Sequence, residues 1–136
     1  MIIKYFELKK KIKDNKYFLL YGNNDGLIEE TITNILKPGL PKNLNLYEEN
    51  EILKDETSFL ESLANKSFFD NEKLIIIKRC SDKVYKFIYS VIEKNFEDVF
   101  FILISDNLEK KSKLRSFFEK EKNTICVPFY EDNNQT

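Results

Sequence analysis

The stretch that decides the fold begins with Tyr17-Phe18-Leu19-Leu20-Tyr21 and continues into Gly22-Asn23-Asn24-Asp25-Gly26. A continuous apolar run of this length, ending at a glycine, is typical of a strand buried on both faces of a parallel sheet. The asparagines and the aspartate after the glycine can cap a helix with their side-chain oxygens. We therefore predict a buried strand, a short turn and a helix that ends at Pro38-Gly39.

Outward from this stretch, apolar runs and amphipathic segments alternate along the chain. Strands are predicted over residues 74–77, 99–104 and 124–127, and a weaker strand, nearer the sheet edge, over 44–47. Helices are predicted over residues 3–14, 57–66, 82–94 and 110–121. Five short strands separated by helices predict the α/β class, with a five-stranded parallel sheet covered by helices.

The length of 136 residues fits one domain. We expect residues 1–130 to form that domain and residues 131–136 to be a polar, frayed tail. The chain ends soon after the last predicted strand, and no further helix follows. We therefore expect it to be a piece of a longer polypeptide, with C-terminal domains beyond the tail.

Composition narrows the class of protein. Hydrophobic residues make up 42% and charged residues 33% of the chain, as in an ordinary soluble globular protein. No apolar run approaches a membrane span and no signal peptide is evident, so we expect a cytoplasmic protein without membrane contact. The chain has no histidine, and Cys80 and Cys126 are too few for a disulfide framework or a zinc site. No metal or cofactor is expected.

The turn at residues 22–26 occupies the position of a phosphate-binding loop, but it lacks the residues that such a loop needs. A working loop is followed by Lys-Ser or Lys-Thr, and this one is followed by Leu27-Ile28. Asp25 places a negative charge where phosphate would bind, and Lys78-Arg79 follows the strand that should end in a metal-binding acid. A helix-capping turn is favoured; the alternative is a nucleotide-binding enzyme with an unusual phosphate loop.

Ser67-Phe68-Phe69 stands where the helix predicted over residues 57–66 ends. That helix presents one apolar stripe, made of Phe59, Leu60, Leu63 and Ala64. At about 100° per residue, both phenylalanines fall away from the stripe. From periodicity alone, the two rings either turn back into the core or form an exposed tip that inserts into a partner.

The predicted helix over residues 110–121 is rich in positive charge. Its basic residues are Lys110, Lys111, Lys113 and Arg115. The net charge of the whole chain is −1, so electrostatics alone do not indicate a nucleic-acid-binding protein. A solvated helix face is the favoured interpretation, and contact with phosphate or with a neighbouring subunit is the alternative.

Several segments in a fixed order give the chain a resemblance to the delta subunit of the bacterial DNA polymerase III clamp loader. They are residues 21–28, 67–69, 74–78, 112–115 and 128–132. The resemblance implies a RecA/AAA+-like module, related to P-loop NTPases, that does not hydrolyse ATP and has no catalytic activity of its own. In this family the module binds the beta sliding clamp and opens one of its subunit interfaces.

The same resemblance implies a role for the apolar pair. Phe68 and Phe69 would enter a hydrophobic pocket on the clamp, with Ser67 shaping the end of the helix. The family more often has Leu-Phe at this pair, so Phe68 is a modest departure. The implied partners are the beta sliding clamp, other clamp-loader subunits through the missing domains, and DNA, contacted indirectly or weakly.

Overall fold

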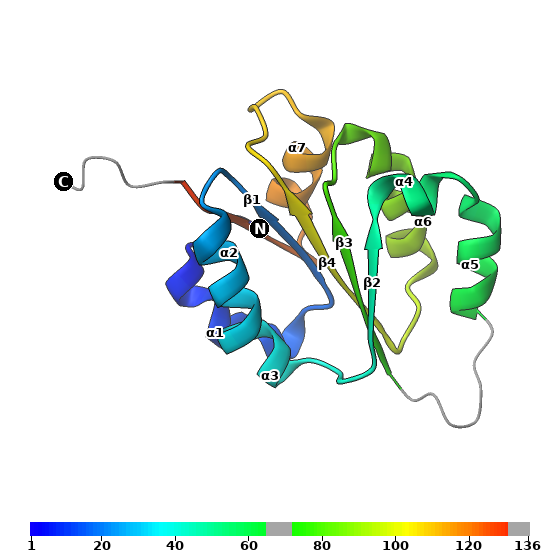
Figure 1. The fold of residues 1–136 in the computed structure, drawn as a ribbon, viewed down its shortest axis with the longest axis horizontal. Helices are drawn as coiled ribbons and strands as arrows, with labels where there is room; N and C mark the ends of the chain where they lie inside the picture. Colours follow the sequence, from blue (N-terminus) through cyan, green and yellow to red (C-terminus); the bar gives the residue numbers. More distant parts are fainter. Residues whose placement is uncertain (65–71, 131–136) are drawn as a thin grey trace.

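The computed structural model describes residues 1–64 and 72–130. Five strands form one parallel sheet in the order β2-β3-β4-β1-β5 (Figure 1). This arrangement confirms the five-stranded α/β prediction, including the edge position of the weak strand, β2. The strands are β1 (Tyr17–Tyr21), β2 (Leu44–Glu48), β3 (Lys73–Lys78), β4 (Val99–Ser105) and β5 (Thr124–Pro128).

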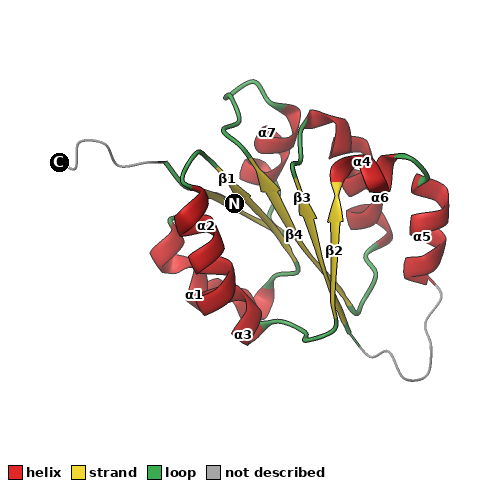
Figure 2. Cartoon of the chain, viewed as in Figure 1, coloured by secondary structure: helices red, strands yellow, loops and turns green. Residues whose placement is uncertain are grey.

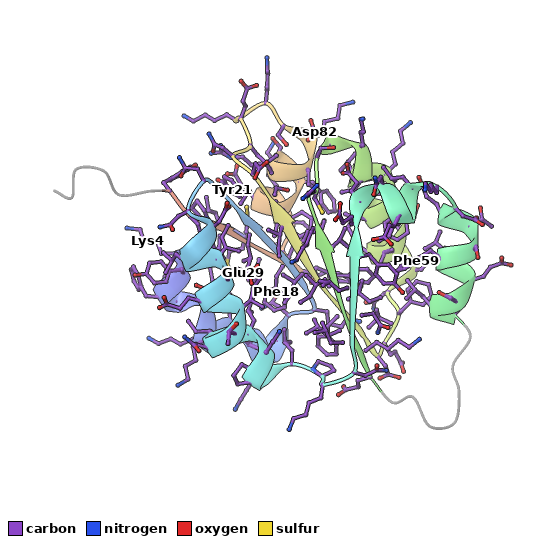
Figure 3. The ribbon with its side chains drawn as sticks, in the orientation of Figure 1. Lys4, Phe18, Tyr21, Glu29, Phe59 and Asp82 are labelled. Atoms are coloured by element: carbon purple, nitrogen blue, oxygen red, sulfur yellow. The ribbon has the colours of Figure 1, made fainter. Side chains whose placement is uncertain are left out.

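The sheet separates two apolar cores, which is why its strands are continuously apolar. In β1, Tyr17, Leu19 and Tyr21 face one core, and Phe18 and Leu20 face the other. Every residue of this strand is buried. Strands covered on both faces have no reason to alternate polar and apolar residues. Figure 3 shows side chains filling the space between sheet and helices on both sides.

Helices cover both faces of the sheet (Figure 2). One face carries α1 (Leu8–Lys11), α2 (Asp25–Thr31) and α3 (Lys37–Gly39), with a π-helical turn, Ile32–Leu36, joining the last two. The other face carries α4 (Glu49–Leu53), α5 (Glu56–Ala64), α6 (Tyr85–Lys94) and α7 (Lys113–Lys120). Short 3-10 turns over Tyr5–Glu7, Ile12–Asp14 and Asp82–Val84 flank α1 and precede α6.

Two predicted helices begin later than expected. The helix predicted from residue 110 begins at Lys113, because Ser112 is its N-cap and accepts a hydrogen bond from the Arg115 amide at 3.2 Å. Lys110 lies in the preceding turn. The helix predicted from residue 3 also begins later, because Ile2 pairs with Cys126 of β5 and the Ile3 amide donates to the Cys126 carbonyl at 2.9 Å.

The strand order places a topological switch point between β1 and β4. The chain leaves β1 toward α2 on one face of the sheet and leaves β4 toward α7 on the other. In open parallel sheets, ligands bind in the crevice beyond the carboxyl ends of the strands at such a point. The candidate site of this molecule therefore begins where Tyr21 ends β1.

Candidate functional site at the carboxyl end of the sheet

The loop after β1 is closed by the chain segment that follows β5. Gly22 has a φ of 134°, and a Cβ atom added there would lie 1.9 Å from the Phe129 carbonyl oxygen. The Phe129 amide donates to the Tyr21 carbonyl at 2.6 Å, and the Asn24 amide donates to the Phe129 carbonyl at 3.1 Å. Glycine is therefore required at position 22 by a neighbouring backbone within the protein.

The amide groups at the start of α2 also have partners within the protein. The Asn24 side-chain oxygen accepts a hydrogen bond from the Leu27 amide at 3.2 Å, and its carbonyl accepts one from Ile28 at 3.1 Å. Asn24 is thus the helix cap that the sequence predicted. In a phosphate-binding loop, amides at these positions point at the ligand.

The two residues that replace the Lys-Ser or Lys-Thr of a phosphate loop pack into the protein. Ile28 is buried in the core beneath α2, and Leu27 packs against that core. Beyond β3, Arg79 adopts a left-handed conformation with a φ of 57° and pairs with Glu48 at 3.7 Å on the surface. Within residues 1–64 and 72–130, no group of three acidic, histidine or cysteine side chains could hold a metal.

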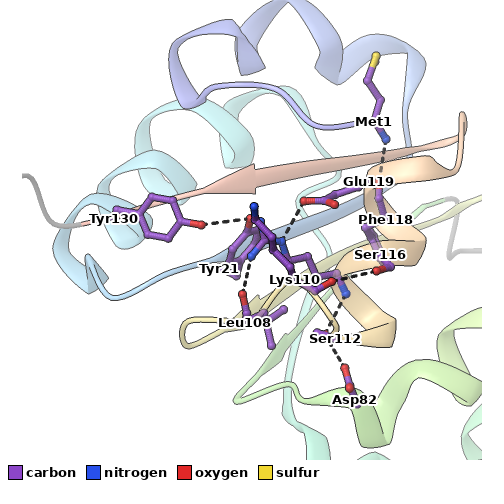
Figure 4. Close-up of polar contacts among 11 residues, drawn as sticks. Met1, Tyr21, Asp82, Leu108, Lys110, Ser112, Ser116, Phe118, Glu119 and Tyr130 are labelled. Carbon is purple, nitrogen blue, oxygen red and sulfur yellow. Dashed lines mark hydrogen bonds and ion pairs between the residues drawn. The ribbon is translucent and has the colours of Figure 1, made fainter.

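Tyr21, Leu108 and Glu119 border the crevice at the end of β1 (Figure 4), and the Arg115 side chain reaches from α7 to all three. Its guanidinium carbon lies 5.1 Å from the centre of the Tyr21 ring. One of its nitrogens donates to the Leu108 carbonyl at 2.7 Å, and another donates to Glu119 at 2.9 Å. Cation–π contact and charge-assisted hydrogen bonds hold the guanidinium in place, so this side chain belongs to the interior of the domain.

Two pKa values reflect this crowded crevice. Burial and the hydrogen bond with the Tyr130 hydroxyl, 3.5 Å away, raise the pKa of Tyr21. Burial alone would lower the pKa of the Arg115 guanidinium, but the hydrogen bond with Glu119 and the surrounding charges outweigh it and raise that pKa. Both groups therefore keep one protonation state through the physiological pH range, Tyr21 neutral and Arg115 charged.

The four basic residues singled out in the sequence do not form one surface. Only 13% of the Arg115 side chain is exposed, and it points into the crevice. Lys110 and Lys111 lie in the turn before α7, where Lys111 pairs with Glu109 at 3.7 Å in solvent. Lys113 is the exposed first residue of α7. The spacing of Arg115 and Glu119, four residues apart, was the sequence signal for this internal pair.

Ser67, Phe68 and Phe69 lie outside the described residues. The helix that leads to them, α5, packs as its stripe predicted. Leu63 is buried, and the Phe59 ring contacts the rings of Tyr47 and Phe87 at 5.0 and 5.6 Å. Ala64 is an exception, because it is exposed. It borders an apolar groove of about 430 Å³ between α5 and the end of α6, lined by Thr57, Leu60, Glu61, Ala64, Lys94 and Phe96.

Three comparisons relate this fold and site to known proteins. The family model of the DNA polymerase III delta subunit matches residues 18–129, from within β1 to the residue that closes the loop at Gly22. No curated protein sequence gives a significant match.

Among solved structures, the crystal structure of RIF2 from Saccharomyces cerevisiae has a TM-score of 0.54 and 20% sequence identity. The match covers 93% of this chain and 53% of that one, so the chain spans about half the length of that structure. At this identity the likeness concerns the fold alone, which is AAA+-like. In residues 1–64 and 72–130, no helix is long and apolar enough to span a membrane.

Proposed function

The chain belongs to the DNA polymerase III delta subunit family, and we propose that it binds the beta sliding clamp and opens it during DNA replication. The observation that carries this proposal is the family match over residues 18–129, because it includes Ser67, Phe68 and Phe69. We propose that these two phenylalanines are the anchors that enter the clamp. Contacts with other clamp-loader subunits, in the cytoplasm, belong to the same proposal.

In this proposal, the free energy of binding the two anchors drives clamp opening. Removing two phenylalanine rings from water contributes roughly 1.5–3 kcal/mol for each ring. This energy opens the ring only if the anchors bind the open clamp more tightly than the closed one, because a ligand shifts an equilibrium only through differential affinity. The proposed role therefore needs no chemical step in this chain.

We also propose that the loop at residues 22–26 does not bind nucleotide. The amides of Asn24 and Leu27 already donate to oxygens of the protein, and Leu27 and Ile28 pack into or against the core. Arg115 occupies the neighbouring crevice, held by Glu119 and the Leu108 carbonyl. These contacts support a structural role for the loop within the domain. They also support the proposal that this subunit has no catalytic activity.

The clamp proposal is tested with the double variant Phe68→Ala/Phe69→Ala, measured for binding to the sliding clamp of the same organism by calorimetry. We expect binding to weaken by several kcal/mol, as for central aromatic anchors, with an unchanged unfolding temperature. The matched control is Phe6→Ala, which removes a phenylalanine that is 67% exposed in the N-terminal segment. This control should bind the clamp like the unmodified chain.

Two results would contradict the assignment of the anchors. A double variant that no longer folds would mean that the rings pack in the core. A folded double variant with normal affinity would mean that the clamp contact lies elsewhere. Opening itself is tested separately, with clamp loaded on nicked circular DNA: the chain should release the clamp without ATP, and full retention at saturating chain would contradict ring opening.

The competing function, a nucleotide-binding enzyme, is tested by thermal unfolding with ATP or ADP and Mg²⁺. A nucleotide at 100 times its dissociation constant would add about 2.7 kcal/mol to the free energy of unfolding. We expect no shift of the unfolding temperature with either nucleotide. A saturable shift would show that the loop binds phosphate in spite of its internal hydrogen bonds.

A further inference from the structure

A groove of about 510 Å³ runs between α6 and α7, on the outer side of the two helices. It is lined by Tyr85, Lys113, Ser116, Phe117, Lys120 and Glu121. Both helices cover the same face of the sheet (Figure 1). None of these lining residues belongs to the loop at residues 22–26 or to the three residues proposed to bind the clamp.

Three aromatic rings meet at this groove. The ring centre of Phe117 lies 5.6 Å from that of Tyr85 and 5.8 Å from that of Tyr89. Tyr85 and Tyr89 are 6.2 Å apart, and Tyr89 is 44% exposed. The core beneath α6 is already filled by other residues of that helix, Phe87, Ile88 and Val91. These three rings therefore form a surface cluster and leave ring area open to a partner.

Exposed lysines flank the aromatic cluster on both helices. On α7, Lys113, Phe117 and Lys120 recur at intervals of four and three residues, so they share one face of the helix. On α6, Lys86 lies three residues before Tyr89. Three acids lie nearby: Glu121 in the groove, Asp82 beside Lys113, and the exposed Glu93, four residues after Tyr89. The excess of positive charge is therefore confined to the groove lining, where Lys113 and Lys120 stand against Glu121.

We propose that this groove binds single-stranded DNA. Proteins that hold single strands without reading sequence combine aromatic rings, on which bases stack, with positive side chains along the phosphate backbone. Both components are present between α6 and α7, within a family of DNA polymerase subunits. A duplex keeps its bases stacked inside, so it offers nothing to the rings. The proposal goes beyond clamp binding and does not depend on it.

The salt dependence of the proposed DNA binding follows from the number of lysines that contact phosphates. With a net charge of −1, the protein gains little from long-range attraction, and the lysines of the groove act locally. Each phosphate neutralised on a single strand contributes about −0.7 to the slope of log K against log salt concentration. Two or three contacts give a slope of roughly −1.4 to −2.1, and the binding should be weak at physiological salt.

The test uses the 136-residue chain and a fluorescein-labelled oligo(dT), with anisotropy measured at several salt concentrations. Tyr89→Ala should weaken binding about fivefold or more, with the salt slope unchanged, because stacking carries no counterion release. Lys120→Gln should make the slope less steep by about 0.7. Tyr5→Ala and Lys9→Gln, an equally exposed tyrosine and a lysine on the other face of the sheet, are the matched controls.

Several outcomes would overturn the proposal. The first is the absence of salt-dependent binding to the oligonucleotide at any accessible protein concentration. The second is normal binding by folded Tyr89→Ala and Lys120→Gln, or weakened binding by the controls, either of which places the contact elsewhere. A duplex bound as tightly as the single strand, or full competition by poly-glutamate, would show that charge alone acts and that an acidic protein segment fits the groove equally well.

Discussion

Gly22 and Gly26 border the same loop, but only Gly22 is fixed by its surroundings. Its φ of 134° and the Phe129 carbonyl, 1.9 Å from an added Cβ, exclude any side chain. At Gly26, the nearest atom to an added Cβ is the side-chain oxygen of Asn24 at 4.0 Å. A pattern with glycines at both ends of a loop therefore contains two positions with different physical requirements.

The first prediction is a matched pair of glycine variants. Gly22→Ala should lower the free energy of unfolding by roughly 3 kcal/mol or more, because the backbone at Phe129 must move. Gly26→Ala should raise it by about 0.5–1 kcal/mol, since alanine is the better residue within a helix. Urea unfolding measures both changes. A Gly22→Ala variant as stable as the unmodified chain would contradict the closed loop.

A second prediction concerns the internal arginine. Arg115→Lys should cost about 1–2 kcal/mol, because a lysine cannot bond the Leu108 carbonyl and Glu119 together while lying over the Tyr21 ring. Lys111→Met is the control, since its ion pair with Glu109 is exposed and should contribute less than about 0.5 kcal/mol. Thermal unfolding measures the loss of stability in each of the two variants. Equal losses in Arg115→Lys and Lys111→Met would argue against the interior role of Arg115.

Among the elements, α7 is anchored at its N-terminus by Asp82, which lies in the 3-10 turn between β3 and α6. The Asp82 carboxylate accepts hydrogen bonds from the Ser112 hydroxyl at 2.6 Å and from the amides of Leu114 at 3.1 Å and Lys113 at 3.2 Å. A carboxylate at this end of a helix also interacts favourably with the helix dipole. One side chain thus joins the start of α6 to the start of α7.

The third prediction is that Asp82→Asn lowers the free energy of unfolding by about 1 kcal/mol at neutral pH, the cost of losing a helix cap. Burial would raise the pKa of Asp82, but the hydrogen bonds from Ser112, Leu114 and Lys113 outweigh it and hold the pKa below its ordinary 3.8. The folded state therefore favours the charged form. This stabilisation is complete above 3.8 and is lost as the pH falls through the lower, folded-state pKa.

Urea titrations at several pH values test this dependence. The difference between the unmodified chain and Asp82→Asn should be constant near neutrality and shrink once the pH falls below 3.8. Asp106→Asn, a change at an exposed aspartate, is the control and should leave the unfolding free energy at neutral pH within about 0.5 kcal/mol. A difference that instead grew in acid would mean that the folded state favours the protonated carboxyl.

At the level of the whole domain, the N-terminus is tied to the last helix and strand. The Met1 ammonium donates to the Phe118 carbonyl at 2.7 Å (Figure 4). It also donates to the carbonyls of Glu121 at 3.0 Å and Thr124 at 2.7 Å. Met1 also accepts from the Cys126 amide at 2.9 Å, so the first residues lie along the edge of the sheet at β5. The positive group sits at the C-terminus of α7, where a cation is favoured.

The fourth prediction follows from this contact. Adding Gly-Ser before Met1 converts the ammonium to an amide, so hydrogen bonds of a charged donor are lost and the unfolding free energy should fall by about 1–3 kcal/mol. The same two residues added after Thr136, six residues beyond Tyr130, should change it by less than about 0.5 kcal/mol. Differential scanning calorimetry on both extended chains makes the comparison. Equal unfolding temperatures for the two extended chains would show that the Met1 ammonium contributes nothing to stability.

The sequence by itself determined the class of the fold. Runs such as Val99–Ser105 and Lys73–Lys78 are apolar throughout their interiors, and only a strand covered on both faces tolerates that pattern. Local patterns also marked the cap at Asn24 and the stripe of α5. Helix starts were less well predicted, because Ser112 and Ile3 are fixed by partners outside their own segments.

Only the tertiary structure decided what the candidate site is made of. Tyr130 meets Tyr21 across 109 residues of sequence, Met1 reaches Phe118 across 117, and Asp82 bonds Ser112 across 30. The sequence alone predicts that Arg115 is one of several surface cations. In the structure, it contacts the Tyr21 ring on β1 and the Leu108 carbonyl in the loop after β4. Periodicity reports which face of an element is buried; it carries no information about which distant backbone or side chain lies against that face, because packing of the whole domain sets those distances.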